Sequence, residues 1–257
     1  MKNVKYILLA TLVFGFLITG CKKENNPTEP NSSTNISNPT GQPMPSFSSS
    51  ADYGGAMASI NYYMAAPIAG LPDISTNAAT GIFGDGVDAG AVTVNSNQLG
   101  KLTTNGKTYY MAPDMNNPMN VLNLNWGGAN HSWNVAGANG IPAFSGSVKS
   151  PNDYTITTPL NNASVTKSSG IQVKWSNTST TSKILVQLIN IQNKGQVKVY
   201  QDLTDNGSYT IPTADLSSFS GDCQIFVVRY TYNYVTAGGK KYYMVSEIVK
   251  SINVKMN

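Results

Sequence analysis

The chain of 257 residues carries 17 Lys and Arg against 13 Asp and Glu, a formal net charge of +4 at pH 7 with its single histidine neutral. Only 12% of its residues are charged, so it lacks the strong positive field with which nucleic-acid-binding proteins neutralise phosphates. One histidine and two cysteines also supply few of the groups that hydrolytic and zinc-dependent mechanisms use. The composition favours a non-enzymatic protein with no nucleic-acid partner.

The first 20 residues have the pattern of a secretory signal. Lys2 and Lys5 precede an uncharged, mostly apolar run from Tyr6 to Gly20, which as a helix would extend about 22 Å at 1.5 Å per residue. That length is shorter than the roughly 30 Å hydrocarbon core of a bilayer. A charged start, a short apolar run and small residues before a cut site are typical of a cleaved signal peptide. We therefore expect residues 1–20 to be removed, which takes away two lysines and lowers the formal charge from +4 to +2.

The tetrapeptide ITGC that ends at Cys21 resembles the lipobox of bacterial lipoproteins. The resemblance implies that Cys21 is acylated and becomes the first mature residue, so that the membrane is a partner through its lipid; two or three acyl chains hold a protein on a bilayer far more firmly than one. Lys22, Lys23 and Glu24 resemble the Lys-plus-acid signal of surface lipoproteins from Bacteroidota, although Asn25 replaces its second acid. The resemblance implies an outer-membrane location and leaves open whether the body faces the periplasm or the cell surface.

Residues 21–50 are rich in Asn, Ser, Thr and Pro and contain few apolar side chains. Such a segment cannot bury enough apolar surface to offset the entropy lost on ordering. We expect a disordered tether, which at about 5 to 6 Å times the square root of its length would hold the folded part a few nanometres from the bilayer.

After residue 50 the sequence predicts an all-β fold. Alternating runs rich in Val, Ile, Thr and Tyr are separated by Gly and Asn turns, and helical periodicity is nearly absent. A Ser-Pro-Asn joint at 150–152 predicts two tandem β-sandwich domains, residues 51–150 and 151–257. The second has about seven expected strands, and Trp175 alternates there with Ile171 and Val173. It resembles immunoglobulin and fibronectin type III sandwiches, which implies a fold and not a function.

The stretch NVLNLNWGGANHSWNVAG at 120–137 predicts a hairpin that turns at Gly127–Asn130. Its register places Trp126 opposite His131 and Leu124 opposite Trp133 on one apolar side. The other side carries amides and a hydroxyl, from Asn123, Asn125, Ser132 and Asn134. Amides satisfy sugar hydroxyls, so these four residues are the candidate ligand-binding set, and a solvated sheet face is the alternative interpretation.

Three other groups could carry chemistry. Asp85 and Asp88 lie in the Gly-rich stretch GIFGDGVDAG, where carboxylate and carbonyl oxygens could collect calcium; a turn capped by Asp explains the same residues. The position of His131 beside the expected turn predicts a structural imidazole, either packed or hydrogen-bonded. Cys223 alternates with Ile225 and Val227, which predicts a small buried hydrophobic side chain. No other cofactor is expected.

These patterns predict a lipid-anchored envelope protein without enzymatic activity, which presents a binding surface for a glycan or another surface protein. The alternative is a structural subunit or scaffold of an envelope assembly. A third interpretation, an enzyme acting on polysaccharide, requires two carboxylates roughly 5 to 9.5 Å apart. The candidate aspartates for that role are Asp73, Asp85, Asp88 and Asp114.

Overall fold

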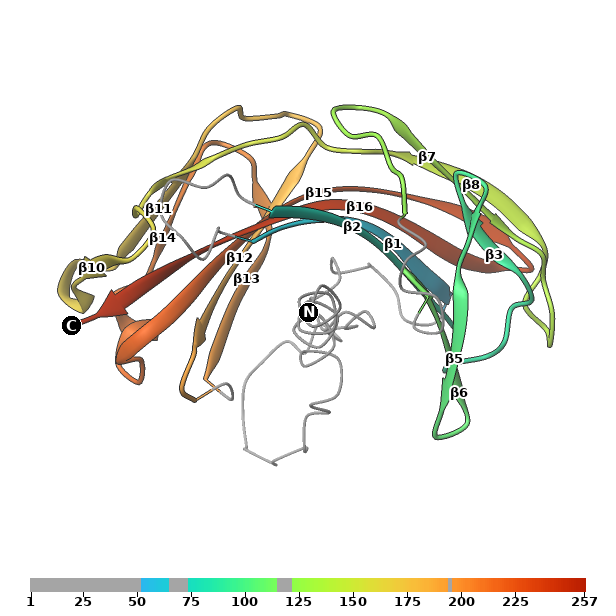
Figure 1. Ribbon diagram of the computed structural model, residues 1–257, viewed down its shortest axis with the longest axis horizontal. Helices are drawn as coiled ribbons and strands as arrows, with labels where there is room; N and C mark the ends of the chain where they lie inside the picture. Colours follow the sequence, from blue (N-terminus) through green and yellow to red (C-terminus); the bar gives the residue numbers. More distant parts are fainter. Residues whose placement is uncertain (1–51, 65–73, 115–121, 194–195) are drawn as a thin grey trace, which may run out of the picture.

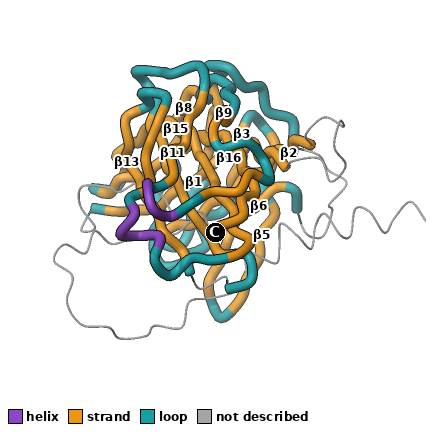
Figure 2. The backbone as a smooth tube through the Cα atoms, turned by 90° about the vertical axis from the view of Figure 1, so that its left-hand side faces the viewer, coloured by secondary structure: helices purple, strands orange, loops and turns teal. Residues whose placement is uncertain are grey.

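The computed structural model describes residues 52–64, 74–114, 122–193 and 196–257. The expected signal peptide, Cys21, the expected tether and Asp73 lie outside the described residues. The described part is mostly β, as predicted, and its only helical segments are two short 3₁₀ turns, Lys167–Ser169 and Thr213–Leu216 (Figure 2). Among the described residues there is no helix of the length and hydropathy that a membrane crossing requires.

One large sheet arches through the whole molecule (Figure 1). From one edge to the other its strands are β13 (Val197–Thr204), β12 (Lys183–Asn190), β15 (Gly221–Ala237), β16 (Lys240–Met256), β1 (Tyr53–Met64), β2 (Ile74–Phe83), β6 (Lys107–Ala112) and β5 (Gly100–Thr104). The short β10 (Ala163–Val165) pairs with the end of β16. All neighbours in the main path are antiparallel except β1 and β16, which are parallel.

Two smaller sheets lie on the convex side of this arch, one at each end (Figure 1). The three-stranded sheet has the order β14 (Ser208–Ile211), β11 (Ile171–Trp175) and β9 (Ile156–Thr158). The four-stranded sheet has the order β4 (Asn97–Gln98), β3 (Val92–Val94), β7 (Asn130–Val135) and β8 (Phe144–Lys149). Each end of the molecule is therefore a two-layered β structure that shares its inner layer with the other end.

The described sheets do not form the two separate sandwiches that the sequence predicted. Strands β15 and β16 are 17 residues long and pair along their whole length. One end of this hairpin underlies the three-stranded sheet, whereas β8 packs on the other. Because β1 from the first half pairs with β16 from the second, main-chain hydrogen bonds continue across the predicted boundary. The large sheet thus contains strands from both halves of the chain.

Two apolar cores fill the spaces between the layers. The core under the three-stranded sheet contains Trp175, Cys223, Ile225 and Val227, among others. The core under the four-stranded sheet is built around Trp133 and includes Phe83, Tyr110 and Met244. Alternation along the strands explains both sets, because successive side chains point to opposite faces. Cys223 is fully buried, which confirms its expected role as a small hydrophobic residue.

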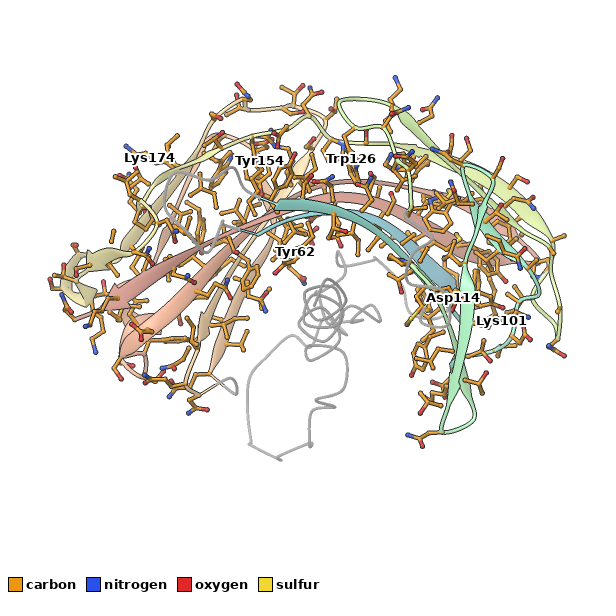
Figure 3. All side chains as sticks on the ribbon, viewed as in Figure 1. Tyr62, Lys101, Asp114, Trp126, Tyr154 and Lys174 are labelled. Carbon is orange, nitrogen blue, oxygen red and sulfur yellow. The ribbon has the colours of Figure 1, made fainter. Side chains whose placement is uncertain are left out.

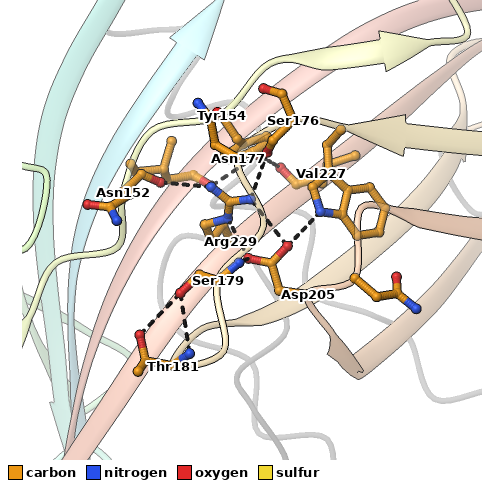
Figure 4. Close-up of polar contacts among 12 residues, drawn as sticks. Asn152, Tyr154, Ser176, Asn177, Ser179, Thr181, Asp205, Val227 and Arg229 are labelled. Carbon is orange, nitrogen blue, oxygen red and sulfur yellow. Dashed lines mark hydrogen bonds and ion pairs between the residues drawn. The ribbon is translucent and has the colours of Figure 1, made fainter.

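A buried polar network connects the segment after residue 150 to the large sheet, which both halves of the chain share and which we call the shared sheet (Figure 4). Arg229 on β15 donates to the carbonyl oxygens of Asn152 and Ser176, at 3.1 and 3.0 Å. Its guanidinium also pairs with Asp205, whose Oδ1 accepts a 2.7 Å hydrogen bond from Trp175 Nε1. The ring of Tyr154 lies 4.7 Å from the guanidinium carbon. The network fixes the connection between the two halves.

Candidate binding surface

His131 connects the four-stranded sheet to the shared sheet by hydrogen bonds. Its side chain is fully buried, and Nδ1 lies 2.7 Å from Ser59 Oγ on β1 and 3.1 Å from Ser246 Oγ on β16. Nε2 lies 2.8 Å from the carbonyl oxygen of Asn125. Because a carbonyl only accepts, Nε2 carries the proton and Nδ1 accepts from a hydroxyl. Burial lowers the pKa of His131, and the expected structural imidazole is confirmed.

The inner face of the four-stranded sheet is buried, whereas its outer face is exposed to solvent. Along β7, His131, Trp133 and Val135 are buried while the residues between them are exposed. Gly146 on β8 allows a close approach to the shared sheet, since a Cβ there would lie 2.7 Å from Met244 Sδ. The outward side chains of β3, β7 and β8 therefore stand on a fixed, tightly packed base.

These outward side chains form an array of hydroxyls and amides over a shallow depression of about 470 Å³. Thr93, Asn134 and Ser145 make one row across the strands, because Thr93 pairs with Asn134 and Asn134 pairs with Ser145. Asn95, Ser132 and Ser147 lie in the next row. We call these six residues the polar array.

Hydrogen bonds orient two amides of the polar array. Asn134 Oδ1 accepts from Ser145 Oγ at 2.8 Å, and Asn95 Oδ1 accepts from the backbone N–H of Ser132 at 2.8 Å. In both cases the amide oxygen is engaged within the protein. Preorganised amide groups of this kind lose little rotamer entropy when a ligand binds.

The structure corrects the predicted hairpin. Strand β7 pairs with β8 and β3, and residues 122–129 form no strand. The N–H groups of Gly127 and Gly128 donate to the carbonyl oxygens of Pro151 and Ser150, at 3.3 and 3.1 Å. The Gly-Gly turn therefore extends the hydrogen bonding between β7 and β8 beyond the ends of these strands. Residues 122–126 do not pair with β7 as a neighbouring strand.

The four predicted ligand-binding residues consequently separate into two pairs. Ser132 and Asn134 belong to the polar array, whereas Asn123 and Asn125 are exposed on the extended segment 122–126, outside the depression. That segment keeps the predicted alternation, since Leu122 and Leu124 are buried. The rings of Trp126 and His131 meet edge to face, with their centroids 4.8 Å apart. The two residues are therefore close together, as predicted, although they do not lie on paired strands.

Four members of the polar array were not predicted: Thr93, Asn95, Ser145 and Ser147. The alternation in VTVN and FSGSV offered a signal, because every second residue there is polar. What the sequence could not indicate was that β3, β7 and β8 are neighbours. Pairing between distant segments decides which polar residues share a face.

The two aspartates of the predicted calcium loop are engaged by lysines. Asp88 accepts from Lys101 Nζ at 2.7 Å and from Tyr110 Oη at 2.7 Å, and these hydrogen bonds lower the pKa of Asp88 to about 2. Asp85 forms an ion pair with Lys107. Across the described ranges no cluster of three or more His, Cys, Asp or Glu side chains could hold a metal ion. Asp114 lies elsewhere, beside Gly100 on β5.

No protein-family model matches this sequence, and a search of curated proteins finds no match.

Proposed function

We propose that the protein is a non-enzymatic, lipid-anchored protein of the bacterial outer membrane that binds a glycan through the polar array. The observation that carries this proposal is the array itself, six hydroxyl and amide side chains over one depression on a rigid sheet. Hydroxyl and amide groups both donate and accept hydrogen bonds, which matches the hydroxyls of a sugar. The depression is open, so it suits an extended chain lying across the strands.

The positions of the aromatic residues disfavour binding of a glycan by stacking on aromatic rings. Trp133, Tyr110 and Phe83 point into the core below the four-stranded sheet. The array would therefore contact a glycan by hydrogen bonds and not by stacking on aromatic rings. Because each hydrogen bond replaces one to water, its net contribution is only about 0.5–1.5 kcal/mol. The proposal thus implies modest affinity for a single site.

The placement of ionisable groups supports binding over catalysis. His131 is completely buried and already holds hydrogen-bonding partners at both ring nitrogens. Asp85 and Asp88 are each paired with a lysine. Within the described part of the chain, these groups are held in structural pairs and do not converge on the polar array. An enzyme acting on polysaccharide needs two carboxylates facing one sugar ring.

Anchoring at Cys21 follows from the lipobox resemblance and is part of the proposal. The expected tether would raise the folded part above the bilayer, and the end with the three-stranded sheet, which resembles an immunoglobulin or fibronectin type III domain in sequence pattern, would act as a spacer. Mass spectrometry of the natively expressed chain tests the anchor. Diacyl or triacyl mass at an N-terminal Cys21 supports it, and an unmodified, freely secreted chain contradicts it.

A glycan array with the full-length protein tests the proposed ligand class. Asn134→Ala and Ser132→Ala remove groups of the array, whereas Asn123→Ala and Asn125→Ala remove exposed groups outside it. We expect binding of at least one glycan that weakens about tenfold in Asn134→Ala, roughly the 1.4 kcal/mol of one hydrogen bond. Blank arrays together with a blank pull-down from envelope extract would reject the proposal, as would equal losses in Asn123→Ala.

A further inference from the structure

A single positive charge adjoins the polar array on the outer face of the four-stranded sheet. Along β8, Val148 is buried against the shared sheet, whereas Ser145, Ser147 and Lys149 lie on the outer face. Lys149 pairs with Asn130 at the start of β7, and both side chains are exposed. These two residues therefore form a third row next to the two rows of the array.

The surroundings of Lys149 are otherwise uncharged. The strands β3, β4, β7 and β8 contain no other Asp, Glu, Lys or Arg, and the histidine of this sheet, His131, is buried on the inner side. The described segments next to these strands, residues 95–96, 122–129 and 136–143, contain no charged side chain either. The outer face is thus a neutral hydrogen-bonding surface with one cation at its end.

The nearest acidic residues in the sequence are already paired with other lysines. Asp88, which precedes β3, pairs with Lys101 at 2.7 Å, and Asp153, which follows β8, pairs with Lys250 at 2.8 Å. Lys149 forms no ion pair with a residue that the structure describes. Its ammonium group is therefore available to a ligand that lies on the array.

Protection of the sheet edge does not account for this charge. β8 is the last strand of its sheet, and lysines on such strands commonly prevent pairing with another chain. Here the carbonyl oxygen of Ser147 accepts a 3.0 Å hydrogen bond from Asn233 Nδ2 on β15, and the carbonyl oxygen of Lys149 accepts one from Thr231 Oγ1. Side chains of β15 therefore already cover the edge that a lysine would guard.

We propose that Lys149 makes the polar array selective for acidic glycans, with the carboxylate of a uronic acid at the Lys149 ammonium and neutral sugar hydroxyls on the array. This inference rests on the proposed function and narrows its ligand class. Charge complementarity of this kind contributes more to selectivity than to total affinity. The amide of Asn130, which lies beside Lys149, would donate a second hydrogen bond to the same carboxylate.

The positions of the three rows determine how such a glycan would lie. From Thr93 on β3 to Ser145 on β8 the array extends over two strand separations, about 10 Å at 4.8 Å each. Lys149 lies four residues further along β8, which is about 14 Å at 3.4 Å per residue. A glycan that contacts both ends therefore crosses the strands diagonally. Because one sugar ring cannot reach both ends, an oligosaccharide should bind more tightly than its monosaccharide.

Matched pairs of oligosaccharides test this proposal by biolayer interferometry with the full-length chain in non-ionic detergent. The probes are tetrasaccharides of galacturonic, mannuronic and glucuronic acid, each paired with a counterpart whose carboxylates have been reduced to hydroxymethyl groups. We expect at least one acidic probe to bind about three- to fivefold more tightly than its reduced counterpart, the range of an exposed ion pair. This preference should decrease as the salt concentration rises.

Variants of two lysines and one amide assign the preference to Lys149. Lys149→Gln should bind both members of a pair equally, Lys149→Arg should keep the preference, and Asn134→Ala should weaken both members by a similar factor. Lys174→Gln is the matched control, because it removes the same charge from an exposed strand position at the other end of the arch (Figure 3). Lys149→Gln should fold normally, since the main chain of this residue, and not its side chain, contacts Thr231.

The possible failures of this inference and of the proposed function can be told apart. Equal binding of the acidic and reduced probes by the parent chain would overturn the role of Lys149 and leave glycan binding by the array in place. A preference that persists in Lys149→Gln, or that is lost to the same extent in Lys174→Gln, would overturn it as well. No binding of any probe, acidic or reduced, would reject this inference, and a blank glycan array in addition would count against the proposed function.

Discussion

Arg229 Nε lies 2.8 Å from Asp205 Oδ2, and both side chains are completely buried. The same carboxylate accepts from Trp175 Nε1 and from the backbone N–H of Ser179. Arg229 in turn holds the carbonyl oxygens of Asn152 and Ser176. One ion pair thus joins β15, the end of β11 and the segment that leaves the first half of the chain, which is why its loss should loosen the junction of the two halves.

Replacing one partner of this pair should be strongly destabilising. Arg229→Met leaves the Asp205 carboxylate buried without its cation, which typically costs about 3–5 kcal/mol. Lys198→Met removes an ion pair with Asp215 in which the Lys198 side chain is 45% exposed, and such surface pairs contribute only about 0–1 kcal/mol. Urea unfolding of both variants measures the difference. Losses of similar size in the two variants would contradict the structural role assigned to Arg229.

Glu247 should make the protein less stable as the pH rises. Burial raises the pKa of Glu247 in the folded state to about 8, against 4.5 as its ordinary value. Between these values the unfolded chain releases a proton that the folded protein keeps, so the free energy of unfolding falls with rising pH, by at most ~1.4 kcal/mol per pH unit. The groups that face it, Tyr230, Ile60, Val245 and Val249, carry no charge in this range.

The corresponding measurement is urea unfolding at several pH values from 5 to 8 for the parent chain and Glu247→Gln. The glutamine cannot ionise, so its unfolding free energy should fall less across this range than that of the parent. Parallel pH profiles for the two proteins would show that Glu247 is ionised, and therefore solvated or paired, in the folded state.

His131 should make the protein less stable as the pH falls. Burial lowers its pKa in the folded protein, while in the unfolded chain the imidazole titrates near 6.5. As the pH falls through 6.5 the unfolded chain therefore takes up a proton that the folded protein resists, and stability decreases. Since Glu247 acts in the opposite direction between pH 4.5 and 6.5, the comparison is made in Glu247→Gln.

In that background, unfolding free energies at pH 7 and pH 5 should differ when His131 is present and differ less in the double variant with His131→Gln. The reason is the geometry of the ring: Nδ1 accepts from Ser59 or Ser246, and a second ring proton would replace that acceptor with a donor. An unchanged difference after removal of His131 would mean that the imidazole titrates normally in the folded protein.

The sequence predicted strand content well and strand partners poorly. Alternation in β7 and β11 correctly indicated which residues are buried, because the period of two follows from the backbone itself. In β15 it did not, because that strand is buried on both faces from Ile225 to Tyr230. The parallel pairing of β1 with β16 joins distant segments, and no local pattern specifies it. The same limit explains the polar array. Ser132 and Asn134 were predicted from their own strand, whereas Thr93 and Ser145 joined them only through tertiary pairing.

The Gly-Gly turn shows how a correct local signal can give a wrong register. Gly127 and Gly128 adopt positive φ values of 80° and 90°, as the predicted turn required. Their N–H groups nevertheless bond to Ser150 and Pro151. Buried Arg229 and Glu247 were also not predicted, because charge in a strand usually marks an exposed position and only the three-dimensional surroundings identify the exceptions.

The most direct test of the polar array as a binding surface uses a photoreactive residue on intact cells, because such a residue captures a bound molecule whatever its identity. Ser132→p-benzoylphenylalanine places the probe in the polar array, and Asn123→p-benzoylphenylalanine places it at an exposed site outside the depression. We expect a cross-linked, glycan-containing product from position 132 that is absent or much weaker from position 123. Equal cross-linking at both positions, or none at position 132, would contradict the claim that this face is the binding surface.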